Sequence, residues 1–157
     1  MITPERSYLG AAAPDRVEGL LEEQARLFAR LEGLGAAQGA MIDADDAEGL
    51  LGVLAERQRI IEEVGRTNAE LDPVRARWDQ FIAGLPEAER DRLRRRIDAI
   101  AEAAARVAAG DEADRRRLEA RREAVAVELS QLSRGQGAVA AYGGTSAGGP
   151  RFQDREA

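Results

Sequence analysis

Residues 17–34 read VEGLLEEQARLFARLEGL. Large apolar side chains recur there at every third or fourth position, the spacing that places them on one face of an α-helix. The expected buried row is Val17, Leu20, Leu21, Gln24, Leu27, Phe28, Leu31 and Leu34. Pro14 and Asp15 stand just before this row and suit the first turn of a helix. The stretch therefore predicts an amphipathic helix of roughly 30 to 40 Å, at about 1.5 Å per residue.

A second helix is expected after a short acidic segment. Asp43, Asp45 and Asp46 bring capping oxygens and negative charge to its start. Its expected buried row is Ala47, Leu50, Leu51, Leu54, Ile61, Val64, Asn68 and Leu71. Two helices joined by so short a segment predict an antiparallel hairpin.

Two prolines punctuate the middle of the chain. Pro73 interrupts the second helix, but the apolar register continues to Leu85, which fits either a kink at Pro73 or a new helix capped by Asp72. Pro86 follows Gly84 and Leu85 and predicts a cleaner break, with another helix starting there.

The last helical stretch is the longest. Its apolar row runs through Leu93, Ile97, Ile100, Ala104, Val107, Leu118, Val125, Leu129 and Leu132, with Asp111 and Asp114 in the middle. One helix of roughly 70 Å is favoured over two helices divided at Gly110-Asp111. From Gly135 onward glycine, serine and threonine dominate, so helical structure is expected to end there.

These patterns predict an all-α fold, an elongated antiparallel helical bundle or coiled-coil hairpin with a long C-terminal helix and a disordered tail. The expected organisation is a flexible N-terminal arm over 1–13, a single helical domain over 14–134 and a Gly/Ser-rich disordered tail over 135–157.

The composition lacks most of the side chains that catalysis and metal binding use. Histidine, cysteine and lysine do not occur among the 157 residues. The G-x-S-x-G pattern at 144–148 has no histidine to serve as base and no predicted strand before it. The acidic segment at 43–48 fails as a calcium loop, because Ala47 and Leu54 stand where oxygen ligands belong. No catalytic residue, cofactor or metal site is predicted, and the protein is not expected to be an enzyme.

The charge pattern argues against nucleic acid and membrane as partners. Arg94 to Arg96 and Arg115 to Arg117 are basic, but residues 86–134 hold twelve arginines against eleven acids, a formal charge of +1. Residues 1–85 hold nine against sixteen, a formal charge of −7. No stretch resembles a secretory signal or is apolar enough to span a bilayer. We expect a cytoplasmic protein that neither inserts into membranes nor binds nucleic acid.

The last four apolar residues of the row, Leu118, Val125, Leu129 and Leu132, are named here the C-terminal row. They fit either of two roles: part of the core, or a surface that captures an amphipathic helix of a partner. The candidate partner-binding residues from this pattern are the C-terminal row and Arg122.

The order of these elements resembles the FlgN-type flagellar export chaperones. The resemblance rests on Leu20 to Leu31, on the turn at 42–46 and on the run GLLGVLAERQRII at 49–61, similar to the family's D…LL…L…R/K-Q…I pattern. The tail, with Tyr142-Gly143 and RFQDR at 151–155, is also similar.

The resemblance implies a cytoplasmic chaperone whose C-terminal helix grips the terminal amphipathic helix of a flagellar hook-associated protein, at the hook-filament junction. It also implies docking on the cytoplasmic domain of the flagellar export gate through a C-terminal tyrosine, here Tyr142. The competing hypothesis is a structural coiled-coil scaffold or self-associating helical adaptor, a homodimer whose apolar rows pair with copies of themselves.

Overall fold

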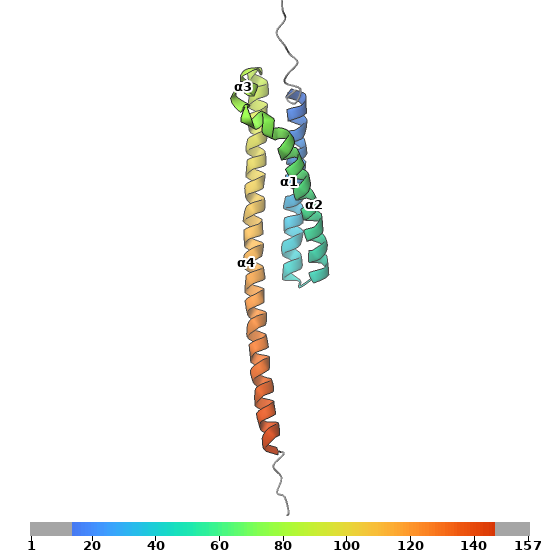
Figure 1. The fold of residues 1–157 in the computed structure, drawn as a ribbon, viewed down its shortest axis with the longest axis vertical. Coiled ribbons are helices and arrows are strands. Elements are labelled where there is room, and N and C mark those ends of the chain that lie inside the picture. The colour runs from blue at the N-terminus through green and yellow to red at the C-terminus, as the bar shows by residue number, and fades with distance from the viewer. Residues whose placement is uncertain (1–13, 147–157) are drawn as a thin grey trace, which may run out of the picture. The chain divides into compact units, whose positions relative to one another are not determined.

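The structure, a computed structural model, describes the backbone of residues 14–146 and the side chains of residues 14–140. The described backbone is helical throughout, apart from short turns: α1 (Pro14–Asp43), α2 (Ala47–Ala76), α3 (Trp78–Ala83) and α4 (Glu87–Ser146) (Figure 1). The predicted all-α class is therefore confirmed. The predicted arm at 1–13 lies outside the described residues.

The chain divides into two compact units, with the boundary inside α4 between Arg115 and Arg116. The N-terminal unit contains α1, α2, α3 and the first part of α4, and the C-terminal unit contains the rest of α4. Each unit is described by itself below.

Helix α1 buries the row that its sequence predicts. Val17, Leu20, Leu21, Gln24, Leu27 and Leu31 are buried, and Phe28 and Leu34 are half-buried. The helix continues through Gly33, Gly35 and Gly39 to Asp43, because its packing outweighs the roughly 1 kcal/mol that a glycine costs inside a helix.

The turn into α2 is held by the predicted acidic residues. Asp45 has a φ of 55°, in the left-handed region that aspartate tolerates better than most residues. Asp46 is the N-cap of α2, and its Oδ1 accepts a hydrogen bond from the backbone N–H of Gly49 at 2.9 Å. The predicted helix start is confirmed.

The predicted buried face of α2 is wrong over its first half. The helix buries Val53, Arg57, Ile60, Thr67, Leu71 and Val74. Leu51, Leu54 and Ile61 are 68 %, 43 % and 47 % exposed. Helix α2 carries apolar residues on two faces. The face with more leucines is exposed, and the buried face includes the polar residues Arg57 and Thr67.

Pro73 does not end α2. The helix continues to Ala76, and α3 begins at Trp78 after Arg77, whose N–H donates to the carbonyl of Val74 at 3.1 Å. A new helix capped by Asp72 is therefore wrong. The predicted break at Gly84–Pro86 is confirmed, since α3 ends at Ala83 and α4 begins at Glu87.

Helix α4 is continuous through Gly110, so the favoured single long helix is confirmed. It also continues through Gly135 and Gly137 to Ser146. The expected end of helical structure at Gly135 is therefore wrong for residues 135–146, and residues 147–157 of the predicted tail lie outside the described residues.

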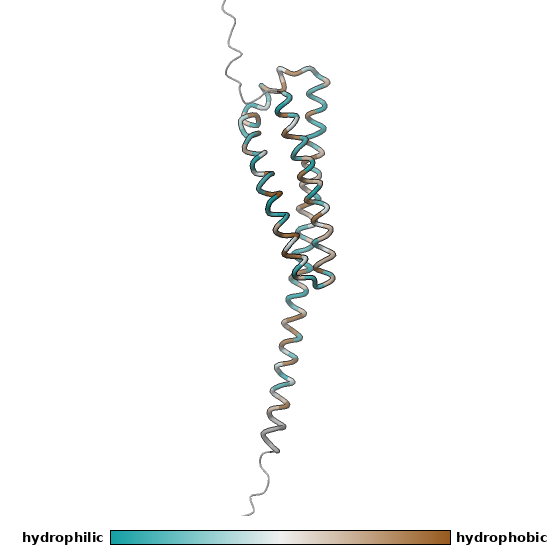
Figure 2. The backbone as a smooth tube through the Cα atoms, turned by 90° about the vertical axis from the view of Figure 1, so that its right-hand side faces the viewer, coloured by the Kyte–Doolittle hydropathy of each residue, from teal (hydrophilic) through white to brown (hydrophobic). Residues whose placement is uncertain are grey.

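Two apolar clusters form the core of the N-terminal unit. Hydrophobic and hydrophilic positions alternate along its helices (Figure 2). The first cluster comprises Val17, Leu20, Leu21, Leu71, Val74 and Leu93, with Trp78, Phe81, Leu85, Ile97 and Ile100 packed against it. The second comprises Leu27, Leu31 and Ile60, with Phe28, Leu34, Val64 and Val107 packed against it. A polar layer lies between them: Gln24 Nε2 donates to Thr67 Oγ1 at 3.0 Å.

Ion pairs fix the direction of α1 against α4 in this unit. Arg92, Arg96 and Arg106 of α4 each donate to a glutamate of α1 that lies 74 residues earlier in the chain: Glu18, Glu22 and Glu32. A constant separation means that the two helices run parallel and in register. Helix α2 is antiparallel to α1, since Arg16 pairs with Glu70 and Arg30 with Glu56.

Candidate partner-binding surface

The C-terminal row lies on one face of α4 in the C-terminal unit. Its members follow one another at intervals of seven, four and three residues, which an α-helix places on the same side. Leu118, Val125, Leu129 and Leu132 are 43 %, 53 %, 60 % and 63 % exposed. In the single chain these residues therefore form an exposed apolar surface and are not part of a core.

The two other candidate residues are Arg122, which belongs to this surface, and Tyr142, which lies further along α4. Arg122 is exposed and shares the face of the row, four residues after Leu118 and three before Val125. Tyr142 lies in the part of α4 whose side chains the structure does not describe. Val127 is exposed too, but two residues correspond to about 200° around a helix, so it lies on the face opposite Leu129.

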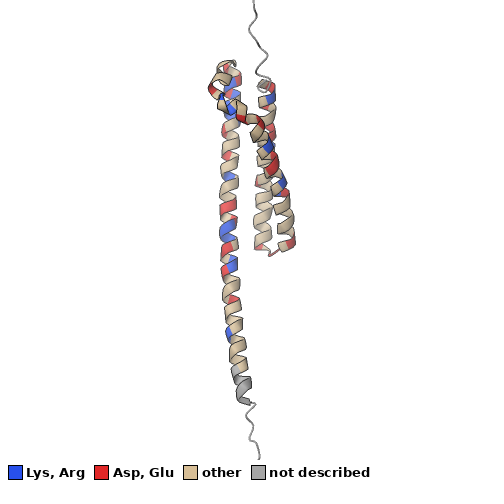
Figure 3. Ribbon diagram, in the orientation of Figure 1, with Lys and Arg blue, Asp and Glu red and all other residues tan. Residues whose placement is uncertain are grey.

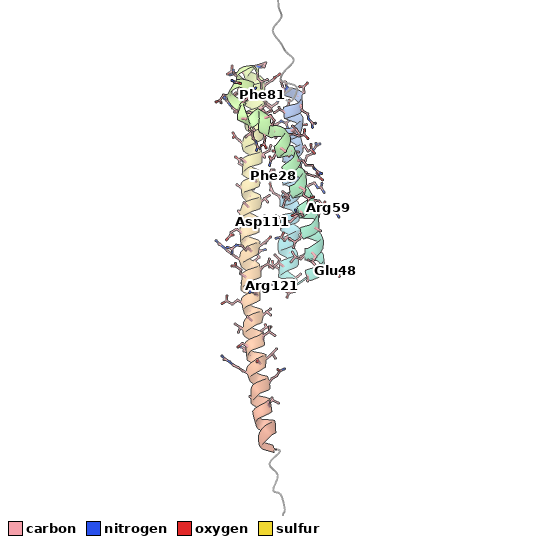
Figure 4. The ribbon with its side chains drawn as sticks, viewed as in Figure 1. Phe28, Glu48, Arg59, Phe81, Asp111 and Arg121 are labelled. Carbon is pink, nitrogen blue, oxygen red and sulfur yellow. The ribbon has the colours of Figure 1, made fainter. Side chains whose placement is uncertain are left out.

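The N-terminal unit contains an apolar groove that the sequence analysis did not identify. We name it the α2–α4 groove; it has a cavity of about 510 Å³ and draws its lining from α1, α2 and α4 and from Trp78 at the start of α3. Phe28, labelled in Figure 4, reaches it from α1. The lining residues used below are Asn68, Arg75 and Trp78 on one side and Ile97, Ala101 and Ala104 on the other.

The walls of the groove continue beyond this cavity. On α2, Leu54 and Ile61 precede Asn68 and Arg75 at intervals of seven residues, so all four lie along one edge of the helix. On α4, the exposed Ala108 follows Ala104 by four residues and extends the opposite wall. Because α2 and α4 run in opposite directions, both walls extend the same way.

A buried ion pair closes the far end of the groove. Arg57 of α2 has a side chain only 8 % exposed, and its Nη2 donates to both carboxylate oxygens of Asp111 on α4, at 2.6 and 2.7 Å. From Arg75 to Arg57, both on α2, the groove therefore spans 18 residues of helix, about 27 Å at helical rise.

Polar side chains in the groove are satisfied from within the unit. Asn68 Oδ1 accepts hydrogen bonds from Gln24 Nε2 and, at 3.0 Å, from Arg75 Nη2.

On the α1–α4 side of the unit, outside the groove, Glu32 raises the pKa of Arg106, first by hydrogen bonding and then by charge attraction. A raised pKa keeps this arginine protonated, so the contact loses its positive charge only in strong alkali and provides no switch near neutral pH.

The described residues offer no assembly for metal binding, since no three carboxylates or other ligating side chains gather among them. Over the same residues, none of the helices combines the length and the apolar character that crossing a bilayer requires.

The groove has only a partial signal in the sequence. The seven-residue spacing of Leu54, Ile61 and Asn68 reveals an apolar edge on α2, but the space between α2 and α4 depends on how three helices pack. No local pattern encodes that distance. Comparison with protein-family models, with curated proteins and with solved structures finds no match for this chain.

Proposed function

We propose that this protein is a cytoplasmic export chaperone of the FlgN type, which holds flagellar hook-associated proteins by their terminal amphipathic helix before secretion. The observation that carries the proposal is the exposed C-terminal row, four aliphatic side chains on one face of α4. A contiguous apolar surface of this kind is a common feature of protein–protein contact sites.

The proposed binding reaction is burial of apolar surface between two helices. Each leucine-sized side chain that leaves water contributes roughly 1.5 to 3 kcal/mol, before the cost of ordering the partner helix. Four such residues support an affinity in the micromolar range or tighter. Arg122, at the edge of the row, would pair with an acidic side chain of the partner and set the orientation of its helix.

Delivery to the export gate is the second half of the proposal. It rests on the resemblance to the chaperone family and assigns to Tyr142 the contact with the cytoplasmic domain of the gate. The helix-binding half does not depend on it, so the two can be tested separately.

A calorimetric titration tests the helix-binding half. The full chain is titrated with a synthetic peptide of the C-terminal helix of a hook-associated protein from the same genome. We expect one-to-one binding with a negative heat-capacity change, the sign of apolar burial. Leu129→Asp should weaken binding at least tenfold, because it places a charge in the middle of the row.

Val127→Asp is the matched control, since it adds the same charge to an equally exposed valine on the opposite face of α4. It should bind the peptide like the unchanged chain. Equal weakening by both variants, or no binding by the unchanged chain, would contradict the proposal. Circular dichroism confirms that both variants keep their helix content.

A structural coiled-coil scaffold is the second candidate. The observation that favours it is the heptad spacing of Leu118, Val125, Leu132 and Val139, all of them more than 40 % exposed. In that case the rows of two copies would pair with each other, and a self-associated species without affinity for any hook-associated peptide would support it.

A further inference from the structure

The length of the α2–α4 groove points to a helix as its occupant. A cavity of about 510 Å³ could hold a small apolar ligand. Such a ligand would leave Leu54 and Ile61, which continue the α2 wall at 43 % and 47 % exposure, in water. A helix of about 20 residues is roughly 30 Å long and would cover the whole groove.

The α4 wall suits a closely packed helix. Ala101, Ala104 and Ala108 project only methyl groups from that wall, and small side chains allow helix axes to approach each other closely. The opposite wall, on α2, carries the larger side chains of Leu54 and Ile61. The groove therefore has small apolar side chains on one wall and large ones on the other.

The chain itself carries a helix of matching length and character. From Leu118 to Val139 the exposed apolar residues of the C-terminal unit span 21 residues, again about 30 Å. Within residues 14–140, no helix covers the groove and no apolar side chains cover the C-terminal row.

The charged residues of the two units, coloured in Figure 3, give the units net charges of opposite sign. Residues 14–115 hold 15 arginines against 23 acidic residues, a formal charge of −8. Residues 116–140 hold five arginines against three acidic residues, a formal charge of +2. Opposite charge brings such surfaces together and disfavours pairing of like with like.

We propose that two copies of this chain form a two-fold dimer in which the C-terminal row of each copy occupies the α2–α4 groove of the other. The exchange closes on itself, so it yields a dimer and no filament. It goes beyond the proposed function, because it requires no flagellar partner, and it differs from a coiled coil in which two rows pair.

The area of the contact explains why the exchange must be reciprocal. A helix about 30 Å long and 10 Å wide covers roughly 300 Å² of a groove and hides a similar area of its own surface. One contact therefore buries on the order of 600 Å², which is below the range of specific interfaces, whereas two reach about 1,200 Å², its lower end.

Sedimentation velocity of the full chain over a range of concentrations tests the proposal with two variants. Ala101→Arg fills the groove from an exposed position on its wall, so the unit should still fold. Leu129→Asp charges the row. Each variant alone should be monomeric where the unchanged chain is dimeric. An equal mixture should associate again, because one row and one groove remain intact in the mixed pair.

Two controls match these variants. Ala99→Arg and Val127→Asp each introduce the same side chain two residues earlier on α4, at exposed positions about 200° around the helix. Both should dimerise like the unchanged chain. Circular dichroism and thermal unfolding confirm that all four variants are folded.

Three outcomes would overturn the proposal. The unchanged chain could be monomeric at every concentration, or the mixture could remain as monomeric as its components. Alternatively, Ala101→Arg could dimerise normally while Leu129→Asp does not, which would show that rows pair with rows. Because the dimer covers the row that the peptide would bind, the two compete for it: a chain that dimerises but binds no peptide supports the dimer and contradicts the proposed function, and a monomeric chain that binds the peptide does the reverse.

Discussion

Arg57 places a full charge inside the N-terminal unit. Its Nη2 is held by Asp111, but its Nη1 has no hydrogen-bond partner within the described residues. Gly35 of α1 lies beside this guanidinium, and a Cβ at that position would be in ordinary contact with Nη1, at 3.5 Å. A buried charge is costly unless it is paired, so we infer that this pair sets the register of α2 against α4.

The two members of this pair should respond differently to substitution. Asp111→Ala leaves Arg57 buried without its partner, and we expect it to lower the free energy of unfolding by about 1 to 3 kcal/mol. Arg57→Met leaves Asp111, whose side chain is 45 % exposed, free to be hydrated, and should cost less than about 1 kcal/mol. Urea unfolding gives the free energy of unfolding of both variants. A larger decrease for Arg57→Met than for Asp111→Ala would contradict the argument.

Arg57 also explains why the buried face of α2 could not be predicted. Sequence reasoning assigns burial to the face with the most leucines, and that face carries Leu51 and Leu54. The face that is buried includes Arg57 and Thr67, whose hydrogen bonds are made to residues of other helices or of the preceding turn. In α1 the polar member of the predicted row, Gln24, sits among leucines and the row is correctly predicted, whereas the buried Gln38, which donates to Asp114, lies beyond that row and was not expected.

At the scale of the element, the start of α2 depends on a glycine for a reason other than backbone freedom. The carboxylate of Asp46 caps the helix by lying over Gly49, so a Cβ at Gly49 would overlap it. Gly52, one turn further on, has nothing within 4 Å of such a Cβ. The two glycines therefore predict opposite consequences for the same substitution.

Gly52→Ala should raise the free energy of unfolding by about 0.5 to 1 kcal/mol, the usual gain from replacing glycine inside a helix. Gly49→Ala should give no gain or a loss, because the displaced cap costs about 0.5 to 2 kcal/mol. Thermal unfolding compares the two. In an Asp46→Ala background Gly49→Ala should become stabilising, and an equal gain for both glycines in the unchanged chain would refute the explanation.

The length of α4 is partly readable from sequence. Its continuity across Gly110 follows from an apolar register that does not shift there, from Val107 to Leu118. Its continuation past Gly135 is not evident from composition, which predicts an end of the helix there. Val139 keeps the seven-residue spacing after Leu132, so the register already contained this signal.

At the scale of the whole molecule, the division of α4 between two units has a measurable consequence. Both apolar clusters of the N-terminal unit lie at or before Val107. Gln38 of α1 donates a hydrogen bond to Asp114 of α4, the last residue but one of the N-terminal unit. The N-terminal unit should therefore be stable without residues 116–157.

A chain that ends at Arg115 should unfold cooperatively, with a midpoint within about 3 °C of the full-length Leu129→Asp chain, which is also expected to be monomeric, a shift that corresponds to less than about 1 kcal/mol. It should lose binding of the hook-associated peptide, because the C-terminal row is removed. Calorimetric unfolding and the same titration measure both properties. A truncated chain without a cooperative transition would show that the two units depend on each other.

The groove shows where reasoning from the sequence ends for this fold. Each of its walls can be recognised as a row on one helix, at Leu54 and Ile61 or at Ala101 and Ala104. The width between the walls depends on α1, which packs against both α2 and α4. Only a three-dimensional arrangement contains that information.

The groove also contains an intrinsic fluorescent probe of its occupancy. Trp78, the only tryptophan of the chain, lines its wall and is half-buried. Any helix or ligand that enters the groove removes water from the indole ring. The fluorescence of the unlabelled protein should then shift to shorter wavelength, so occupancy of the groove can be followed in real time in dilute solution.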